Sequence, residues 1–314
     1  MACISRRTFL RLLAAAAAFP LLDPRSPSAP FNRLRGAVEA SIGTRAIGLD
    51  VRRLNSGGTE LFRIQYNAFN YYPLASCFKA FLALYYLWYT ARERWENGEG
   101  SPLYRVAVLS DNLATGALLA EVAQRVPGRG HALEKFNDFL TFTLFLPIGL
   151  YSWNWPGSAT AGLFDTRYAA TAARAVRIPS GEHRVDNVCA AADLANGYVF
   201  LARRDNDVYA HPYFQQVLTA ARDLLAIPAR NYQSPIERAF AQGYIGKDGI
   251  LPSDQLATGR VVNDAGLIRV EDGWYVLSLM SAGESESTVL EALRLLADEI
   301  ARYEGYFVPA RFGG

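Results

Sequence analysis

The sequence predicts an α/β fold of the α+β sandwich type: an antiparallel sheet built from both chain ends, flanked by helices, with a mostly helical lobe inserted between its halves. Hairpin patterns near both termini and helical periodicity in the middle of the chain carry this prediction. Hydrophobic residues make up 51% of the 314 residues, which suffices for a large core. We expect the sheet lobe over residues 30–72 and 235–314, and the helical lobe over residues 73–234.

Two hairpins are predicted, one near each end of the chain. The first surrounds the turn-forming sequence Asn55–Gly58, and the second surrounds Glu271–Gly273. The expected strands cover residues 46–51, 60–65, 266–270 and 274–280.

Helical patterns fill most of the interval between the hairpins. Residues 76–90, 190–201 and 213–225 are predicted helices, and the first of these is apolar all round, as expected for a helix buried inside a domain. A further helix is expected over residues 287–303, where apolar residues recur at helical spacing. A cleft between the two lobes is where a substrate site is expected.

Residues 1–29 are interpreted as an export signal and set apart from the domain at 30–314. Ser5-Arg6-Arg7-Thr8-Phe9-Leu10-Arg11 precedes an apolar run over residues 12–19 and a loop rich in proline and serine. This arrangement resembles a twin-arginine signal, and the apolar run is too short to span a bilayer. We expect a periplasmic or extracellular monomer with no stable membrane anchor after signal removal. A membrane-retained N-terminal helix is the alternative.

The charge balance gives no sign of a nucleic-acid partner. The whole chain carries 32 basic and 30 acidic residues, and removing the signal's four arginines and one aspartate leaves 28 against 29. The basic character therefore belongs to the signal.

Cysteine and histidine usage points to neither a disulfide framework nor a metal. Cys77 and Cys189 can pair only if the fold brings them together, and we expect Cys77 to pack inward. The three histidines lack ligand spacing. No metal and no cofactor are expected.

A serine and a lysine at the start of the buried helix are the first candidates for catalysis. In Ser76-Cys77-Phe78-Lys79 the two side chains lie three residues apart and share one helical face. A serine hydroxyl needs a nearby base before it attacks a carbonyl carbon. Burial lowers the pKa of a lysine, so Lys79 is suited to that role. The alternative is a lysine that only caps a turn or extends to water.

A second polar motif lies between two apolar segments. Ser110-Asp111-Asn112 follows the apolar residues 106–109 and precedes 113–119. Its alternative interpretation is a helix cap, since all three residue types suit that position.

Together these two motifs resemble the S-x-x-K and S-D-N motifs of class A serine β-lactamases and penicillin-binding proteins. The order of elements over residues 31–303 is also similar to that family. The resemblance implies that Ser76 is the acylated nucleophile and Lys79 its base. It further implies that Ser110 relays a proton to the leaving nitrogen and that Asn112 hydrogen-bonds the substrate amide.

The third motif of that family, K-[ST]-G, is expected within Val261–Leu267, where only the glycine is kept. By this alignment Asp264 replaces the lysine that holds a substrate carboxylate, Gly266 allows close approach, and the Leu267 N–H joins that of Ser76 in an oxyanion hole. An aspartate repels a carboxylate, so none is expected to bind there. Arg269 and Lys247 are the alternative sources of a cation.

The family's E-x-x-L-N string, which carries the deacylating glutamate, is absent. The corresponding loop, Leu150–Gly157, is aromatic, and Tyr151, Trp153 and Trp155 are expected either to line a pocket or to pack under the loop. Other carboxylates in the wider interval have no spacing that singles one out: Glu134, Asp138, Asp165 and Glu182. Acylation is therefore better supported than hydrolysis of the acyl-enzyme.

The expected function is an exported serine hydrolase of the β-lactamase type that acts on β-lactams or related amides through an acyl-Ser76 intermediate. A penicillin-binding D-alanyl peptidase or transpeptidase acting on cell-wall peptides is one alternative. A non-catalytic binding protein that keeps the cleft is another.

Overall fold

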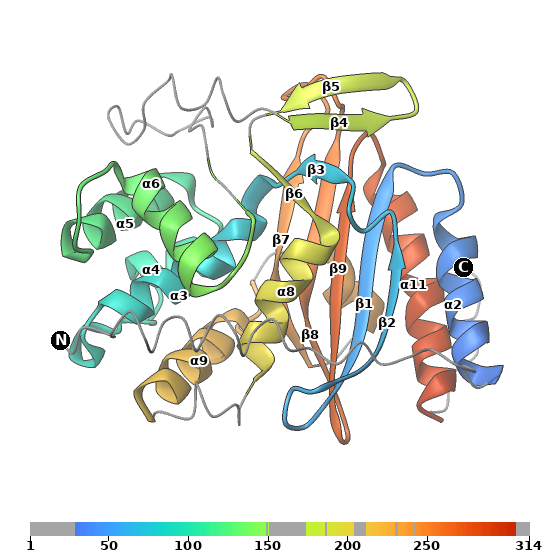
Figure 1. The fold of residues 1–314 in the computed structure, drawn as a ribbon, viewed down its shortest axis with the longest axis horizontal. Coiled ribbons are helices and arrows are strands. Elements are labelled where there is room, and N and C mark those ends of the chain that lie inside the picture. The colour runs from blue at the N-terminus through green and yellow to red at the C-terminus, as the bar shows by residue number, and fades with distance from the viewer. Residues whose placement is uncertain are drawn as a thin grey trace.

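In the computed structural model, both chain ends build one antiparallel sheet (Figure 1). The structure describes residues 29–148, 150, 174–185, 187–203, 212–229, 232–240 and 243–305. Its described strands run in the order β2-β1-β9-β8-β7. Their bounds are β1 (Ile47–Asn55), β2 (Glu60–Tyr66), β7 (Tyr244–Leu251), β8 (Val261–Val270) and β9 (Gly273–Ser281). The predicted fold class is confirmed.

Both predicted hairpins form. Asn55 closes the first turn, where its Oδ1 accepts from the backbone N–H groups of Gly57 and Thr59. Strands β8 and β9 form the second hairpin, and β9 pairs with β1 along its whole length. The edge strand β7 was not among the predicted strands.

One face of the sheet is covered by helices from both chain ends (Figure 1). Their bounds are α2 (Ala29–Ile42), α10 (Pro235–Phe240) and α11 (Glu286–Tyr303). The apolar stripe of α11 packs into the core on this face, and Ser285 caps the helix by accepting from the Thr288 N–H. The helix predicted at residues 287–303 is thus confirmed.

The opposite face of the sheet meets the helical lobe (Figure 1). The described helices between β2 and α10 are η1 (Ala75–Phe78), α3 (Lys79–Tyr89), η2 (Arg92–Arg94), α4 (Pro102–Ala107), α5 (Asn112–Arg125), α6 (Ala132–Asp138), the π-helical η3 (Phe139–Thr143), α8 (Ala191–Ala202) and α9 (Pro212–Leu225). Residues 79–87 of α3 are buried, as its apolar sequence predicted. A Cβ at Gly197 of α8 would lie 2.3 Å from the Phe81 ring, so this glycine lets α8 approach α3 closely.

Helix α8 is also tied to the sheet by a buried charged network. Arg52 of β1 donates to Asp50 Oδ1 (2.6 Å), to Asn196 Oδ1 (2.6 Å) and to the Ala192 carbonyl (2.9 Å). The Arg52 charge is therefore paired and hydrogen-bonded although its side chain is only 2% exposed.

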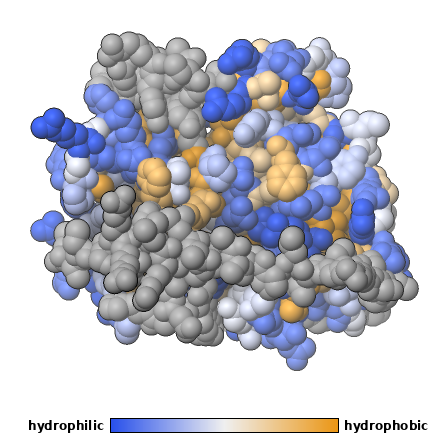
Figure 2. All heavy atoms as spheres, viewed as in Figure 1, coloured by the Kyte–Doolittle hydropathy of each residue, from blue (hydrophilic) through white to orange (hydrophobic). Residues whose placement is uncertain are grey.

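Two short ladders complete the described structure: β3 (Tyr71–Pro73) pairs with β6 (Val188–Ala190), and β4 (Arg174–Ile178) pairs with β5 (Gly181–Val185). Strand β3 leads directly into η1 and so connects the sheet lobe to the helical lobe. On the face drawn in Figure 2, hydrophobic side chains form small groups among hydrophilic ones, in keeping with an apolar core inside.

Several predictions from the sequence fall outside the described residues. These are the export signal, apart from its last residue, and the aromatic residues Tyr151, Trp153 and Trp155. Over the described ranges, no helix has both the length and the apolar character needed to cross a membrane. The lobe boundaries stay predictions.

Candidate active site

Ser76 and Lys79 lie at the boundary between the sheet lobe and the helical lobe. Ser76 belongs to the short helix η1, and the Lys79 N–H donates to its carbonyl, which places the two side chains one tight turn apart. The preceding Ala75 has a φ of +49°, a left-handed conformation that costs energy for a residue with a Cβ. Such strain at the entrance to η1 is typical of a functional site.

The Lys79 side chain reaches into the second motif. Its Nζ donates to the Ser110 carbonyl (2.6 Å), to Ser110 Oγ (3.2 Å) and to Asn112 Oδ1 (2.6 Å). Lys79 is fully buried, and Ser110 adopts a left-handed φ of +58°. The structure therefore brings Lys79 together with both polar residues that the sequence singled out, one turn after Ser76.

Desolvation by burial, the largest cause, and the positive charge of Lys247 together lower the pKa of Lys79 from 10.5 to about 7. Asp248 and Asp111 oppose this shift. A lysine with such a pKa exists largely as the neutral amine slightly above pH 7, so it can accept a proton there. Within the described residues no hydrogen bond joins Lys79 Nζ to Ser76 Oγ.

Asp111 has the capping role that was the alternative interpretation of its motif. Its Oδ1 accepts from the Ala114 N–H (3.0 Å) as the N-cap of α5, and Oδ2 accepts from Arg105 Nε (2.9 Å). Burial raises the pKa of Asp111, but these hydrogen bonds and the Arg105 charge hold it below its ordinary value. The cap fixes the start of α5 and with it the positions of Ser110 and Asn112.

The strand that edges the site is β7, which corrects the placement expected from the sequence. A Cβ on Gly249 of β7 would lie 2.7 Å from Ser76 N and 2.9 Å from Ala75 Cβ. Only a glycine allows this approach of β7 to η1. Lys247-Asp248-Gly249 therefore lies at the edge where the sequence analysis expected Asp264-Ala265-Gly266, with a lysine at its first position and a glycine at its third.

Asp264, Gly266 and Leu267 lie on β8, which has a strand on each side. Asp264 faces α10, where its Oδ2 accepts from the Ile236 N–H (2.6 Å) and its Oδ1 accepts from the Tyr244 hydroxyl. A Cβ on Gly266 would meet the Tyr244 ring at 2.5 Å, not Ser76. These residues were placed in the wrong strand.

The same correction removes Leu267 from the oxyanion hole. Leu267 is fully buried, and it pairs with Ile245 on one side and Val276 on the other. Ladder pairing on both sides uses the backbone groups of an interior strand. On this side of the sheet, the edge strand β7 is the one with unpaired backbone donors.

Of the two alternative cations, Lys247 lies on β7 near Ser76, whereas Arg269 stacks over the Trp274 ring at 5.5 Å. Lys247 Nζ donates to its neighbour, reaching Asp248 Oδ1 at 2.6 Å and the Asp248 carbonyl at 3.2 Å. Lys247 is 5% exposed and Asp248 is 19% exposed. The edge of the site therefore carries an ion pair instead of a single cation.

Two buried asparagines support the site and were not singled out by the sequence. Asn263 Nδ2 donates to the carbonyls of Pro73 (2.6 Å) and Leu74 (3.4 Å), and its Oδ1 accepts from the Ser281 N–H (2.9 Å). Asn263 thus anchors the chain two residues before Ser76 to the sheet. A polar residue in a largely apolar strand was the only available signal.

Asn137 of α6 has a comparable role farther along the chain. Its Nδ2 donates to the Leu150 carbonyl (2.9 Å), and its Oδ1 accepts from the Leu150 N–H (2.8 Å). These two bonds fix the chain at the start of the aromatic segment.

The described carboxylates that the sequence analysis named between the second and third motifs are occupied elsewhere or exposed. Glu134 Oε2 accepts from the His131 N–H (2.7 Å) in a capping arrangement, and Glu182 pairs with Arg177 (3.0 Å) on β5. Asp138 is exposed at the end of α6, and Asp165 lies outside the described residues.

Both described cysteines are free and buried, and Cys77 packs inward as predicted. Burial raises the pKa of each thiol well above its ordinary value. Throughout the described ranges, no three His, Cys, Asp or Glu side chains gather as a metal site requires.

An antiparallel sheet from both chain ends, packed against a helical lobe, is the fold of the class A β-lactamases. Solved structures with this fold include class A β-lactamases, to which this chain is similar over most of its length. No protein-family model matches the sequence, and no curated protein matches it.

The β-lactamase from Sphaerobacter thermophilus aligns with a TM-score of 0.58 and 18% identity, covering 89% of this chain and 99% of the other. A class A β-lactamase from Bacteroides cellulosilyticus aligns with a TM-score of 0.59 and 14% identity, over 88% and 100% of the two chains. The β-lactamase from Streptomyces albus G gives 0.52 and 17%, over 86% and 99%. At these identities the likeness establishes the fold alone.

Proposed function

We propose that this protein is an exported serine hydrolase of the β-lactamase type that forms an acyl-Ser76 intermediate with β-lactams or related amides. The observation that carries the proposal is the buried Lys79, one turn after Ser76 and hydrogen-bonded to Ser110 and Asn112. Burying an amine costs free energy because it disfavours the charged form, and this lowers the pKa of the amine. Shifted pKa values of this kind are concentrated in active sites.

In the proposed reaction, Ser76 Oγ attacks the carbonyl carbon while neutral Lys79 accepts the hydroxyl proton. The Ser76 N–H, with a backbone donor from β7, stabilises the developing oxyanion. Ser110 Oγ, already bonded to Lys79 Nζ, passes a proton to the leaving nitrogen. Asn112 holds the substrate amide, and the product of this stage is an ester on Ser76.

A penicillin-binding D-alanyl peptidase or transpeptidase is the second candidate function, and one observation favours it. Of the described carboxylates that the sequence named between the second and third motifs, Glu134 caps a helix, Glu182 pairs with an arginine and Asp138 is exposed. Without a base to activate water, the ester on Ser76 has a long lifetime. Such an enzyme would transfer the acyl group of a cell-wall peptide to another acceptor.

Incubation with a chromogenic cephalosporin, followed by intact-protein mass spectrometry, tests the proposal. Fast colour change with turnover supports β-lactam hydrolysis, and a persistent adduct that Ser76→Ala lacks supports the penicillin-binding type. The control Ser287→Ala removes a serine of α11 far from the cleft and keeps the adduct. No adduct and no turnover with any β-lactam, β-lactam ester or D-alanyl peptide leaves only a non-catalytic binding protein.

Export is part of the proposal and rests on the sequence of residues 1–29. In a bacterial host with twin-arginine export, the full chain is expected in the periplasmic or extracellular fraction, and Arg6→Lys/Arg7→Lys is expected to retain it in the cytoplasm. Wild-type protein that stays in the cytoplasm would contradict this part alone.

A further inference from the structure

The edge of the site beside Ser76 carries a carboxylate next to its cation. A lone cation at this edge would attract anions, whereas a paired one attracts them less. Gly249 of β7 lies so close to η1 that a Cβ on it would be 2.7 Å from Ser76 N, and the two residues before it are Lys247 and Asp248. Asp248 is accessible enough to meet a bound molecule, whereas Lys247 is buried. Of the two charged side chains on β7, Asp248 is therefore the one that is more open to a bound molecule.

The charge of Lys247 is already satisfied by its neighbour. Its ammonium donates to Asp248 Oδ1 at 2.6 Å and to the Asp248 carbonyl at 3.2 Å, and within the described residues these are its hydrogen bonds. A charge-assisted bond of this length in a partly buried position has to be broken before Lys247 can bind an external anion. The pair offers no net positive charge.

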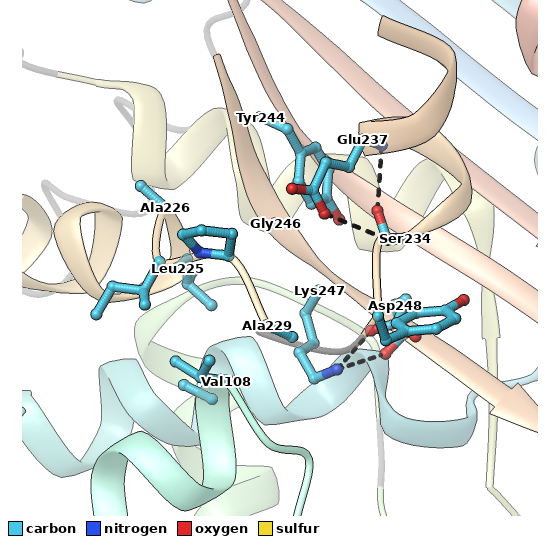
Figure 3. A pocket seen from close by; sticks show the side chains of 14 residues that line it. Val108, Leu225, Ala226, Ala229, Ser234, Glu237, Tyr244, Gly246, Lys247 and Asp248 are labelled. Atoms are coloured by element: carbon cyan, nitrogen blue, oxygen red, sulfur yellow. Dashed lines mark hydrogen bonds and ion pairs between the residues drawn. The ribbon is translucent and has the colours of Figure 1, made fainter. Parts of the chain in front are cut away.

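A cavity of about 50 Å³ next to this pair adds a second carboxylate (Figure 3). It runs along β7 from Tyr244 to Asp248, and Ser234 and Glu237 line its other side. Lys247 is the one Lys or Arg among the described lining residues. Asp248 and Glu237 outnumber it, so the charges that line this cavity favour neutral groups over anions.

We propose that Asp248 sets the charge specificity of the enzyme: by pairing with Lys247 it makes the cleft select acyl donors that carry no carboxylate beside the scissile amide. This inference rests on the proposed acylation of Ser76 and names the class of substrate that the site accepts. Natural substrates are then neutral amides or esters, in contrast to β-lactams with a free ring carboxylate.

The expected size of the effect follows from Coulomb attraction and repulsion. One unit charge at roughly 6 Å with an effective dielectric of about 20 corresponds to about 100-fold in an equilibrium or rate constant. Removing the Asp248 charge both ends the repulsion and frees Lys247. The preference between an anion and its neutral counterpart is thus expected to change by about 100-fold.

The experiment compares benzylpenicillin with its methyl ester, which differ by one charge. Acylation rate constants are measured by stopped flow and mass spectrometry, each divided by the rate of hydroxide hydrolysis of the same compound. Wild-type protein is expected to prefer the ester by at least about tenfold, and Asp248→Asn is expected to shift the ratio by about 100-fold toward the carboxylate. The double variant Lys247→Gln/Asp248→Asn should lose most of that gain, because no cation is left to free.

Asp223→Asn is the matched control, since it removes one carboxylate from the exposed face of α9 and is expected to leave the ratio unchanged. Equal acylation of both compounds by wild-type protein, or a ratio that Asp248→Asn does not move, overturns the inference while leaving acyl-Ser76 chemistry in place. If neither compound acylates Ser76, the proposed function fails instead. Isothermal titration calorimetry with Ser76→Ala then measures the affinities for benzylpenicillin and its methyl ester without acylation. Equal affinities would overturn the inference.

Discussion

The buried lysine makes the pH dependence of acylation a sharp test of the proposed chemistry. With the pKa of Lys79 lowered to about 7, the neutral fraction of the amine rises about tenfold between pH 6 and pH 8. A lysine with the ordinary pKa of 10.5 would be about 0.1% neutral at pH 7.5, several hundred times less than Lys79. The acylation rate constant is therefore expected to rise through pH 7 and to level off above pH 8.

The assay is stopped-flow acylation at saturating benzylpenicillin methyl ester between pH 5.5 and 9.5. An uncharged acyl donor is chosen so that changes of charge in the cleft act on Lys79 and not on substrate binding. Lys79→Arg, which stays cationic, is expected to lose at least about 100-fold in rate at every pH, the size typical of a lost general base. Circular dichroism of the same samples checks that the fold is kept.

Two neighbouring charges move the profile in opposite directions. The Lys247 charge lowers the pKa of Lys79, so Lys247→Gln raises that pKa and shifts the rising limb to higher pH. The Asp248 charge raises it, so Asp248→Asn shifts the limb to lower pH. A profile that is flat between pH 6 and 8, a limb near pH 10, or equal shifts in both variants would refute the reasoning.

Three further outcomes follow from contacts around the site. Gly249→Ala is expected to slow acylation at least tenfold, because the new Cβ would lie 2.7 Å from Ser76 N. Gly98→Ala is the control, since its new Cβ has no atom within 4 Å, and it is expected to leave the rate unchanged. Asn263→Ala is expected to lower the free energy of unfolding in urea by about 3 kcal/mol, since it leaves buried backbone groups unpaired. Burial raises the pKa of Asp264 to about 7 from 3.8, so its contribution to stability is present below about pH 4 and lost as pH rises through 7. Relative to Asp264→Asn, wild-type protein should then lose on the order of 4 kcal/mol between pH 4 and 8, and parallel stability curves would contradict this.

Local sequence patterns were enough for most of the elements. The strands at both ends were predicted because turn-forming residues separate runs with strand composition, and the observed β1, β2 and β9 extend those predictions by a few residues. Helix α3 was predicted because a long apolar stretch can only be buried. Strand β7 was missed because Tyr244–Leu251 contains two glycines and two charged residues, a composition depleted in strands.

The candidate site was predicted in its two helical motifs and placed wrongly in its third. Ser76 with Lys79, and Ser110 with Asn112, are each set by a few consecutive residues, so short strings identify them. The third motif depends on which strand lies at the edge of the sheet, and no local pattern encodes strand order. A glycine on an interior strand was therefore mistaken for the one that touches the site.

By itself, the sequence determined the fold class, the apolar helix that carries Lys79 and the serine beside it, because hydrophobic periodicity and helix spacing are local properties of the chain. Only the tertiary structure decided that β7 edges the cleft, that Asn263 anchors the approach to Ser76, and that Asp248 neutralises Lys247. Each of these depends on contacts between segments far apart in the chain or on how an edge strand exposes its side chains. The pKa of Lys79 belongs to both levels, since its apolar neighbours follow from the sequence but the charges of Lys247 and Asp248 reach it only through the fold.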